Sequence, residues 1–335
     1  MGSSRLPKEF TATHVREILE QDYGEQTWLV KNLVPAPSIS IITGDPGSYK
    51  SWICLHLALC VANGDKFLGE FETADFSWSG GVLILDKENH LRNIQRRLQG
   101  MNADLSAVIR FNGDQDFTLG NDNDVETLIE YIKSEKIQLL IIDPLSWYHE
   151  ADENTSREMG SIMRRIKRIA VETEINILLI HHHRKEQADA PNPSHSIRGS
   201  SAISGAVDCH IAVSVKSTND TLIFKQTKLR DAEKHKDFAV KIIVDSEKNV
   251  IREFKYLGEY VKNAEFYNEV DTQILELFQE GAQLSFAQIM NELEGLCSEP
   301  IGRKRLKTLI YEKKLESKPE GHNKHIYYLP TSKLA

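Results

Sequence analysis

The stretch Gly44-Asp-Pro-Gly-Ser-Tyr-Lys-Ser51 decides the fold. It follows an apolar run that ends at Thr43, and it precedes a stretch with helical apolar spacing, 50–63. A strand, a glycine-rich loop and a helix that begins with Lys-Ser are typical of a phosphate-binding loop, whose backbone N–H groups and helix N-terminus hold phosphate oxygens. In such a loop Lys50 reaches the β- and γ-phosphate oxygens and the Ser51 hydroxyl binds Mg²⁺.

One position departs from the usual motif. Tyr49 stands where the pattern G-x-x-x-x-G-K-[ST] has its second glycine, so the strict pattern fails. The alternative interpretation is an ordinary Gly/Pro turn between a strand and a helix, with no nucleotide. The sequence predicts a nucleotide-binding segment made of Gly44, Asp45, Pro46, Gly47, Ser48, Tyr49, Lys50, Ser51 and Trp52.

Apolar runs rich in Ile, Leu and Val alternate with amphipathic stretches around this loop, as in βαβ units that feed a parallel sheet. The predicted buried strands are 38–43, 81–85, 137–142, 175–180 and 209–215. The predicted helices are 50–63, 91–101, 124–134 and 156–172. Two alternating stretches, 221–228 and 238–245, predict an antiparallel extension of the sheet. The expected fold class is therefore α/β with a mainly parallel central sheet.

Two acids follow predicted strands and are candidates for chemistry. Asp143 ends the run Leu140-Ile-Ile-Asp143, where a carboxylate at the strand tip would hold Mg²⁺ beside the phosphate loop. Glu88 lies just past the strand 81–85 and is the candidate that orients the attacking water, with Asp86 as the second choice. The alternatives are a turn before Pro144 and a helix N-terminal acid favoured by the helix dipole.

Composition limits the class of protein. The chain has 335 residues, enough for about two domains. It carries 41 Lys+Arg against 49 Asp+Glu, and this net charge of −8 argues against nucleic-acid binding over the whole surface. No long apolar run or secretory leader is recognisable, so we expect a cytoplasmic protein without a membrane partner. The four cysteines have no metal-ligand spacing and are expected to be buried free thiols.

A second unit is predicted for residues 263–335. The stretches 271–279, 286–293 and 301–311 have helical apolar spacing, and 315–329 reads as a hairpin with a turn at 320–323. Three helices and a hairpin are typical of a winged helix-turn-helix. The helix 301–311 carries Arg303, Lys304, Arg305 and Lys307, so it would be the recognition helix for duplex DNA. Winged helices also serve protein contacts, and that alternative stays open.

A family resemblance joins these motifs. The sequence resembles RecA-like ATPases of the plasmid replicative helicase RepA group, which are related to DnaB helicases and described as AAA-type ATPases. The segments that carry the resemblance occur in the same order in that group: Gly44 to Ser51, 83–88, Arg96-Arg-Leu98, 140–144, 179–185, 198–203 and 206–208. It implies a RecA-like ATPase domain over 1–262, with an N-terminal segment 1–37.

The resemblance also implies residue roles. Lys50 and Glu88 would be catalytic, His182 would sense the γ-phosphate, and Lys228 with Arg230 would act on the ATP site of a neighbouring subunit. Ser51 and Asp143 would hold Mg²⁺. The segment 186–200 would contact single-stranded DNA in a central channel.

Together these expectations describe a Mg²⁺-dependent ATPase motor that acts on DNA as a homo-oligomer, with a hexamer favoured. One alternative is an ATP-driven switch or loader without strand unwinding. A second alternative, suggested by Tyr49, is a nucleotide-binding scaffold with little turnover. The cofactors expected for the first two are ATP and Mg²⁺.

Overall fold

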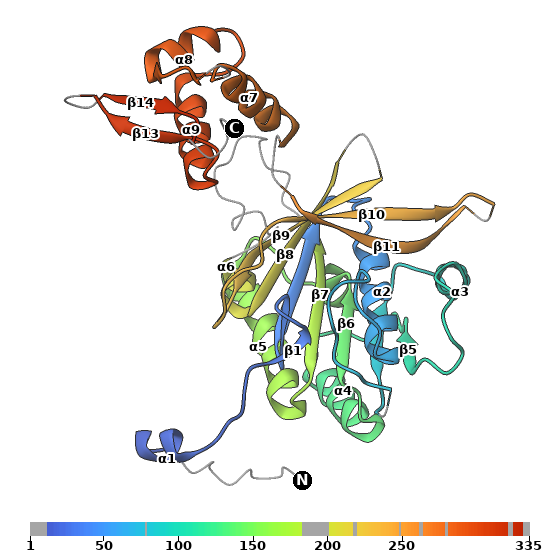
Figure 1. Ribbon diagram of the computed structural model, residues 1–335. Coiled ribbons are helices and arrows are strands. Elements are labelled where there is room, and N and C mark those ends of the chain that lie inside the picture. Colours follow the sequence, from blue (N-terminus) through green and yellow to red (C-terminus); the bar gives the residue numbers. More distant parts are fainter. Residues whose placement is uncertain are drawn as a thin grey trace, which may run out of the picture. The chain divides into compact units, whose positions relative to one another are not determined.

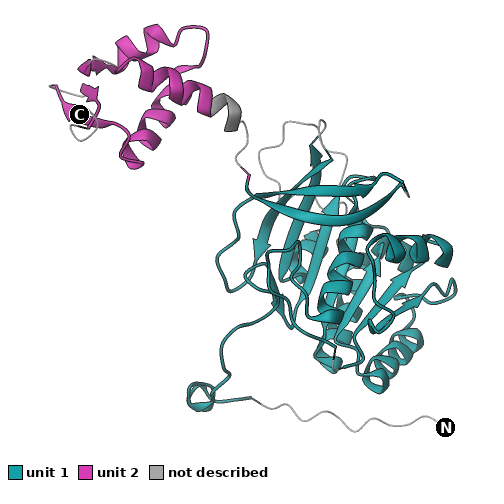
Figure 2. Ribbon diagram, turned by 45° about the vertical axis from the view of Figure 1, so that its right-hand side comes forward, with its two compact units in different colours: residues 1–259 teal, residues 260–335 magenta. Residues whose placement is uncertain are grey.

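The computed structural model describes residues 12–77, 79–182, 201–216, 220–247, 249–260, 264–278, 281–320 and 324–330. The chain divides into two compact units, Met1–Glu259 and Tyr260–Ala335 (Figure 2). Each unit is described by itself below.

A nine-stranded sheet forms the centre of the first unit, in the order β11-β10-β9-β8-β3-β7-β6-β4-β5 (Figure 1). Six neighbouring strands are parallel: β3 (Ile39–Gly44), β4 (Val82–Asp86), β5 (Ile109–Asn112), β6 (Leu139–Asp143), β7 (Asn176–His182) and β8 (Cys209–Lys216). Three antiparallel strands extend the sheet: β9 (Thr221–Leu229), β10 (Phe238–Asp245) and β11 (Val250–Glu259). The prediction of an α/β fold with a mainly parallel sheet is confirmed.

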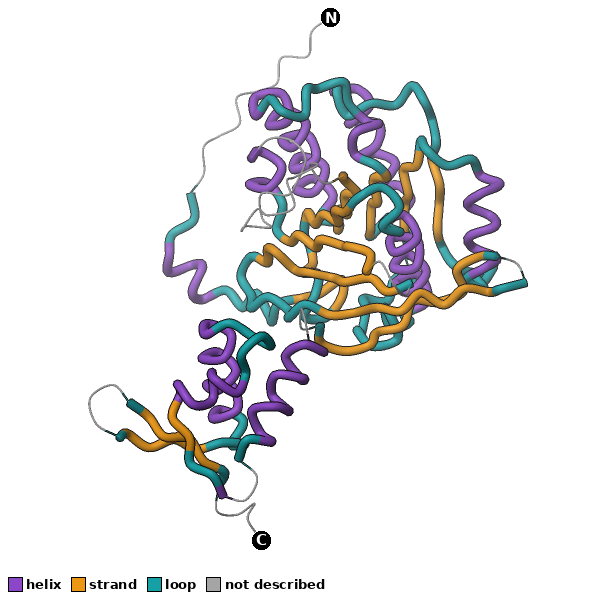
Figure 3. The backbone as a smooth tube through the Cα atoms, turned by 90° about the horizontal axis from the view of Figure 1, so that it is seen from above, coloured by secondary structure: helices purple, strands orange, loops and turns teal. Residues whose placement is uncertain are grey.

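Helices cover both faces of this sheet (Figure 3). On one face, α2 (Lys50–Asn63) packs its apolar residues into a core with the strands, and α3 (Leu91–Gly100) lies beside β11. On the other face, α4 (Asp122–Glu135), α5 (Ser156–Thr173) and α6 (Ser201–Ala206) form a second core. Because both faces are covered, the central strands β3, β4 and β6 are buried at every position, which explains their continuous apolar sequence.

Smaller elements complete this unit. The short helix α1 (Val15–Glu20) contains no buried residue, and β1 (Thr27–Val30) pairs with β2 (Val34–Ala36) in a separate two-stranded sheet. The 3₁₀ helix η1 (Leu145–Tyr148) follows β6 directly. Cys54, Cys60 and Cys209 are buried free thiols as predicted, whereas Cys297 of the second unit is partly exposed. Of the helices in the described ranges, none combines the length and the apolar character needed to cross a membrane.

The second unit consists of α7 (Ala264–Glu276), β12 (Leu284–Ser285), α8 (Phe286–Glu292), α9 (Glu299–Tyr311), β13 (Glu316–Pro319) and β14 (His325–Tyr328). The strands form a small sheet in the order β12-β14-β13 around a core that includes Ile274, Ile289 and Leu306. Ser285 starts α8 with a capping box to Gln288. The predicted turn residues 321–323 lie outside the described residues.

The basic residues of α9 have different environments. Arg305 Nε donates to Asp271 Oδ1 at 2.8 Å, and the side chains of this ion pair are only 12% and 13% exposed. Arg305 therefore joins α9 to α7 inside the unit, and the structure does not support its predicted role on a DNA-reading surface. Arg303 stacks its guanidinium on the ring of Phe286, 3.9 Å from the ring centre, and stays exposed. Lys307 is also exposed.

Candidate active site

The predicted site residues converge at the carboxyl ends of the parallel strands. Gly44 of β3 is the register partner of His182 on β7, and Asp86 of β4 is the register partner of Asp143 on β6. In front of these strand ends lies a cavity of about 390 Å³. It is lined by Pro46, Gly47, Tyr49, Lys50, Ser51, Trp52, Glu88, Arg97, Asp143, Pro144, Ile180 and His182.

The loop between β3 and α2 is tightly folded. A Cβ atom at Gly44 would overlap Ser48 Oγ and the backbone oxygen of Val213, so only glycine fits there. Gly47 has a φ of 80°, a left-handed conformation that glycine adopts without strain. Tyr49 also has a left-handed φ, 63°. The tyrosine therefore adopts the conformation for which the usual motif supplies glycine, and the turn forms despite the departure in sequence.

Lys50 points back into this loop. Its Nζ donates to the backbone oxygens of Gly44 and Asp45, both at 2.9 Å, and to Ser48 Oγ at 3.4 Å. Burial lowers the pKa of Lys50, and the nearby Asp143 carboxylate opposes this shift. A buried ammonium group that is held by loop oxygens stands where phosphate oxygens would replace them as acceptors.

Ser51 and Asp143 offer oxygen ligands at the floor of the cavity. The Ser51 side chain hydrogen-bonds to Asp143, whose side chain is buried at the end of β6. Burial raises the pKa of Asp143 to about 7, and the negative charges of Asp86 and Glu88 act in the same direction. A hydroxyl and a carboxylate are the ligand types that Mg²⁺ takes from a phosphate loop and its neighbouring strand. The residues present therefore fit a magnesium ion.

Glu88 lies on a turn that Asp86 shapes. Asp86 Oδ1 accepts from the backbone N–H of Glu88 at 3.0 Å and of Asn89 at 2.9 Å, and Asn89 Nδ2 donates to both carboxylate oxygens. Asp86 is buried and fully engaged in this turn, whereas the Glu88 side chain is exposed and lines the cavity. The geometry favours Glu88 over Asp86 as the carboxylate that meets solvent and substrate.

Arg97 is a cavity residue to which the sequence reasoning gave no role. It comes from α3, where it lies one turn after the buried Ile94 and so faces the same side. Its guanidinium donates to Asn89 Oδ1 at 2.9 Å and stacks on the Trp52 ring, 5.1 Å from the ring centre. This i, i+3 spacing was the signal that identified its direction. Arg97 brings a fixed positive charge to the cavity, beside the Glu88 turn.

The two histidines at the end of β7 face opposite sides. His182 lines the cavity, as expected for a residue near the γ-phosphate. His181 is fully buried, and its Nδ1 is 4.0 Å from Glu153 Oε1. Within the described residues no cluster of His, Cys, Asp and Glu could hold a metal by itself.

Lys228 and Arg230 lie away from this cavity. Leu229 on β9 pairs with Cys209 at the start of β8, next to the amino-terminal ends of the parallel strands. There Lys228 Nζ donates to the backbone oxygen of Ser204 at 2.8 Å, and Arg230 forms an ion pair with Asp208 at 2.7 Å. They are therefore not part of the phosphate cavity of their own chain. The predicted DNA segment 186–200 lies outside the described residues.

The fold and the site define a phosphate-loop protein with a mainly parallel sheet. The sequence matches the AAA domain family (AAA_25) over residues 5–188, more than half of the chain, and the chain belongs to this family.

Two solved structures share the fold. One is a separately solved ATPase domain, with 14% sequence identity and a TM-score of 0.50 over 71% of this chain and 95% of that chain. The other is a DnaB-like replicative helicase, described with its interactions with primase, with 13% identity and a TM-score of 0.52 over 71% of this chain and 64% of that chain. At these identities the likeness shows a RecA-like fold. Membership of the RepA group stays a prediction.

Proposed function

We propose that this chain is a Mg²⁺-dependent ATPase that works as an oligomeric motor on DNA, in the manner of a replicative helicase. The observation that carries the proposal is the convergence of Lys50, Ser51, Asp143 and Glu88 on one cavity. These residues come from three separate segments of the sequence, and each has the chemistry that phosphoryl transfer to water requires.

Each residue has a distinct task in this proposal. The loop 44–51 and Lys50 bind and orient the phosphates, and Ser51 with Asp143 holds the metal. Bound Mg²⁺ supplies positive charge that neutralises the phosphates. Glu88 orients a water molecule and accepts its proton as the bond to phosphorus forms. Arg97 and His182 lie where they can stabilise charge on the γ-phosphate.

Lys228 and Arg230 act in trans in this proposal. Their place at the opposite strand ends supports this, because no rearrangement within the parallel sheet would bring them to their own cavity. Mixing two inactive variants tests it. Lys50→Ala and Arg230→Ala should each lose ATP turnover, and a mixture should regain part of it, because some interfaces then join an intact Lys50 to an intact Arg230. A mixture no more active than its components contradicts action in trans.

A low-turnover nucleotide scaffold is the second candidate function, and the left-handed Tyr49 favours it. If the scaffold is correct, wild type and Glu88→Gln should release phosphate equally slowly. An ATP-driven switch or loader shares the whole site with a helicase. A strand-unwinding assay separates the two, because the switch should hydrolyse ATP without opening a duplex.

The second unit is proposed to be a winged helix that binds duplex DNA. The order of three helices with β12, β13 and β14 supports this, as do the exposed Arg303 and Lys307 on α9. A triple variant of Arg303, Lys304 and Lys307 to alanine should weaken DNA binding and lower its salt dependence. Unchanged affinity and unchanged salt dependence would remove DNA from this unit and leave a protein contact.

A further inference from the structure

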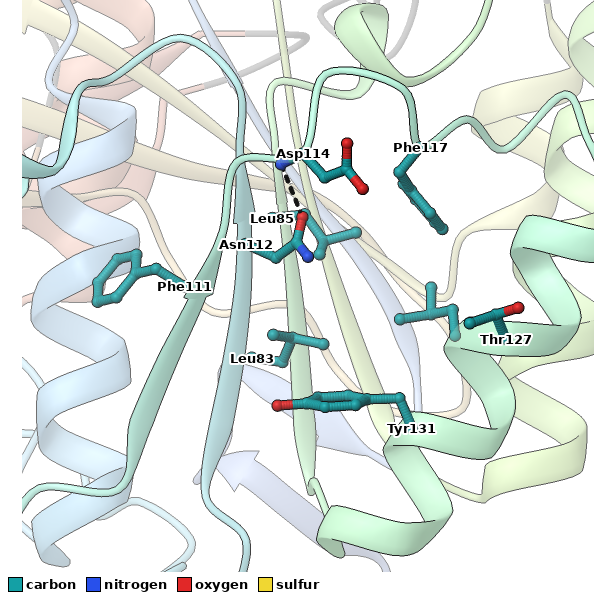
Figure 4. Close-up of a pocket in the computed structure, with 9 residues that line it drawn as sticks. Leu83, Leu85, Phe111, Asn112, Asp114, Phe117, Thr127 and Tyr131 are labelled. Carbon is teal, nitrogen blue, oxygen red and sulfur yellow. Dashed lines mark hydrogen bonds between the residues drawn. The ribbon is translucent and has the colours of Figure 1, made fainter.

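A second cavity lies beside the end strand β5, between β4, α4 and the loop after β5 (Figure 4). We name it the edge pocket and define it by Leu83, Leu85, Leu128, Tyr131, Phe117 and Asp114. We propose that the edge pocket receives an aromatic or leucine-sized side chain from a partner protein, carried beside lysine or arginine, and that its occupation slows ATP hydrolysis. The second half of this proposal rests on the ATPase function proposed above.

The size and lining of the edge pocket suit one large apolar side chain. Its volume is about 250 Å³. Pockets for whole small ligands are usually larger, at roughly 300–1,000 Å³. Leu83 and Leu85 form the floor, and the Tyr131 ring and Phe117 stand on either side (Figure 4). Tyr131 is 41% exposed although it borders this apolar space, so an incoming side chain would cover it.

The charge around the edge pocket selects a cationic partner. Between Arg110 and Lys133 the chain carries six acidic residues and no Lys or Arg. Asp122 and Glu126 are paired with arginines of α5, and Asp124 accepts from the backbone of Thr118. Three further acids are exposed on this surface, namely Asp114, Asp116 and Glu130. Lys87 reaches the loop from β4, and loop carbonyls surround its ammonium group.

Two sets of contacts join the edge pocket to the proposed active site. Lys87, the residue before Glu88, donates to the backbone oxygens of Gln115 at 3.0 Å and Phe117 at 2.6 Å. On the other side, Leu119 N donates to the backbone oxygen of Tyr148 at 2.8 Å, in the 3₁₀ helix that follows Asp143. The loop that forms one wall of the pocket is thus tied to both acidic residues of the site. A side chain that displaces Phe117 would pull the Glu88 turn through Lys87.

Binding is tested with two short probes, acetyl-Lys-Phe-Lys-amide and acetyl-Glu-Phe-Glu-amide, on full-length protein with methyl-labelled leucine. The lysine peptide should shift the NMR signals of Leu83, Leu85 and Leu128 and bind about fivefold more tightly than the glutamate peptide. The double variant Asp114→Asn, Asp116→Asn should remove this preference. The matched double variant Glu292→Gln, Glu294→Gln, in the second unit, should keep it. Absence of leucine shifts, or equal binding of the two peptides, would overturn the proposal.

Coupling is tested by filling the pocket from within. Thr127→Trp should block the lysine peptide and lower kcat about threefold or more, with unchanged nucleotide affinity, as expected for a displaced catalytic group. In a Lys87→Met background the same substitution should have no further effect. If Thr127→Trp does not fold, the lysine peptide gives the same readout on wild type.

The outcomes separate the two proposals. A protein without ATP turnover that still binds the lysine peptide would contradict the ATPase but support the docking site. Peptide binding without any change in kcat of an active enzyme would overturn the coupling. An oligomer that dissociates when Thr127→Trp is introduced would overturn the partner protein, because a second copy of this chain would then be the occupant.

Discussion

Asp86 and Asp143 are register partners at the ends of the adjacent parallel strands β4 and β6, so two buried carboxyl groups lie side by side beneath the phosphate cavity. Their surroundings give them different properties. The Asp86 carboxylate accepts several N–H groups of its own turn. Asp143 keeps only limited compensation for burial, and its pKa rises to about 7. The arrangement gives one acid to shape the Glu88 turn and one to meet a metal.

The first prediction concerns Asp143 and pH. Its pKa is higher in the folded protein than in the unfolded chain, so its stabilising contribution is complete below about pH 4 and is lost as pH rises to about 7. Asp143→Asn stays neutral and should lack this loss. Urea unfolding of ligand-free protein should therefore show wild type losing stability relative to Asp143→Asn across this range. Parallel pH profiles of the two proteins would contradict the raised pKa.

The second prediction concerns Tyr49. A non-glycine residue in the left-handed region is strained by about 1 kcal/mol. Tyr49→Gly should therefore be about 1 kcal/mol more stable than Tyr49→Ala, although both lose the ring. Urea unfolding of the two variants gives the difference directly, and the alanine variant controls for lost packing. Equal stabilities would mean that the left-handed turn is not adopted in solution.

The third prediction concerns Arg97. Arg97→Met keeps much of the side-chain volume but loses the hydrogen bond to Asn89 and the charge over Trp52. We expect kcat to fall about tenfold, because a positive charge near the transferred phosphoryl group and a support of the Glu88 turn are both lost. Trp52→Phe keeps an aromatic face for the guanidinium and serves as the control, with a smaller effect. An unchanged kcat in Arg97→Met would remove Arg97 from the mechanism.

The fourth prediction separates two basic residues of α9. Arg305→Ala leaves Asp271 partly buried without its cation and should destabilise the second unit by about 3 kcal/mol. Lys307→Ala, at an exposed position, should change stability by less than about 0.5 kcal/mol. Thermal unfolding of the full chain, followed by a probe in this unit, measures both. Equal effects of the two substitutions would show that the Arg305–Asp271 pair does not hold α9 to α7.

The sequence predicted the central strands well because they are buried on both faces and therefore continuously apolar, as in Leu139–Asp143. It missed β5, whose Arg110 and Asn112 interrupt the apolar pattern at the end of the sheet. It also missed β11, which alternates polar and apolar residues and carries two irregularities in its register with β10. End strands lack the uniform burial that makes a pattern recognisable.

The candidate site was predictable where a residue type and a strand end coincide, as for Lys50 and Asp143. The task of Asp86 was not, because an Asx turn leaves no signal beyond an Asp before an Asn. The internal pairing of Arg305 was also hidden, since its partner Asp271 is distant in sequence and a run of basic residues reads as a surface. These are long-range pairings that only the folded chain reveals.

The most direct test of the proposed ATPase is phosphate release by wild type and Glu88→Gln, measured with Mg²⁺ beside equilibrium nucleotide binding. Glutamine keeps the size of Glu88 and loses its ability to accept a proton. We predict that turnover falls about 100-fold or more, while nucleotide affinity stays within about threefold. Equal turnover by the two proteins would contradict the assignment of Glu88 as the residue that activates water.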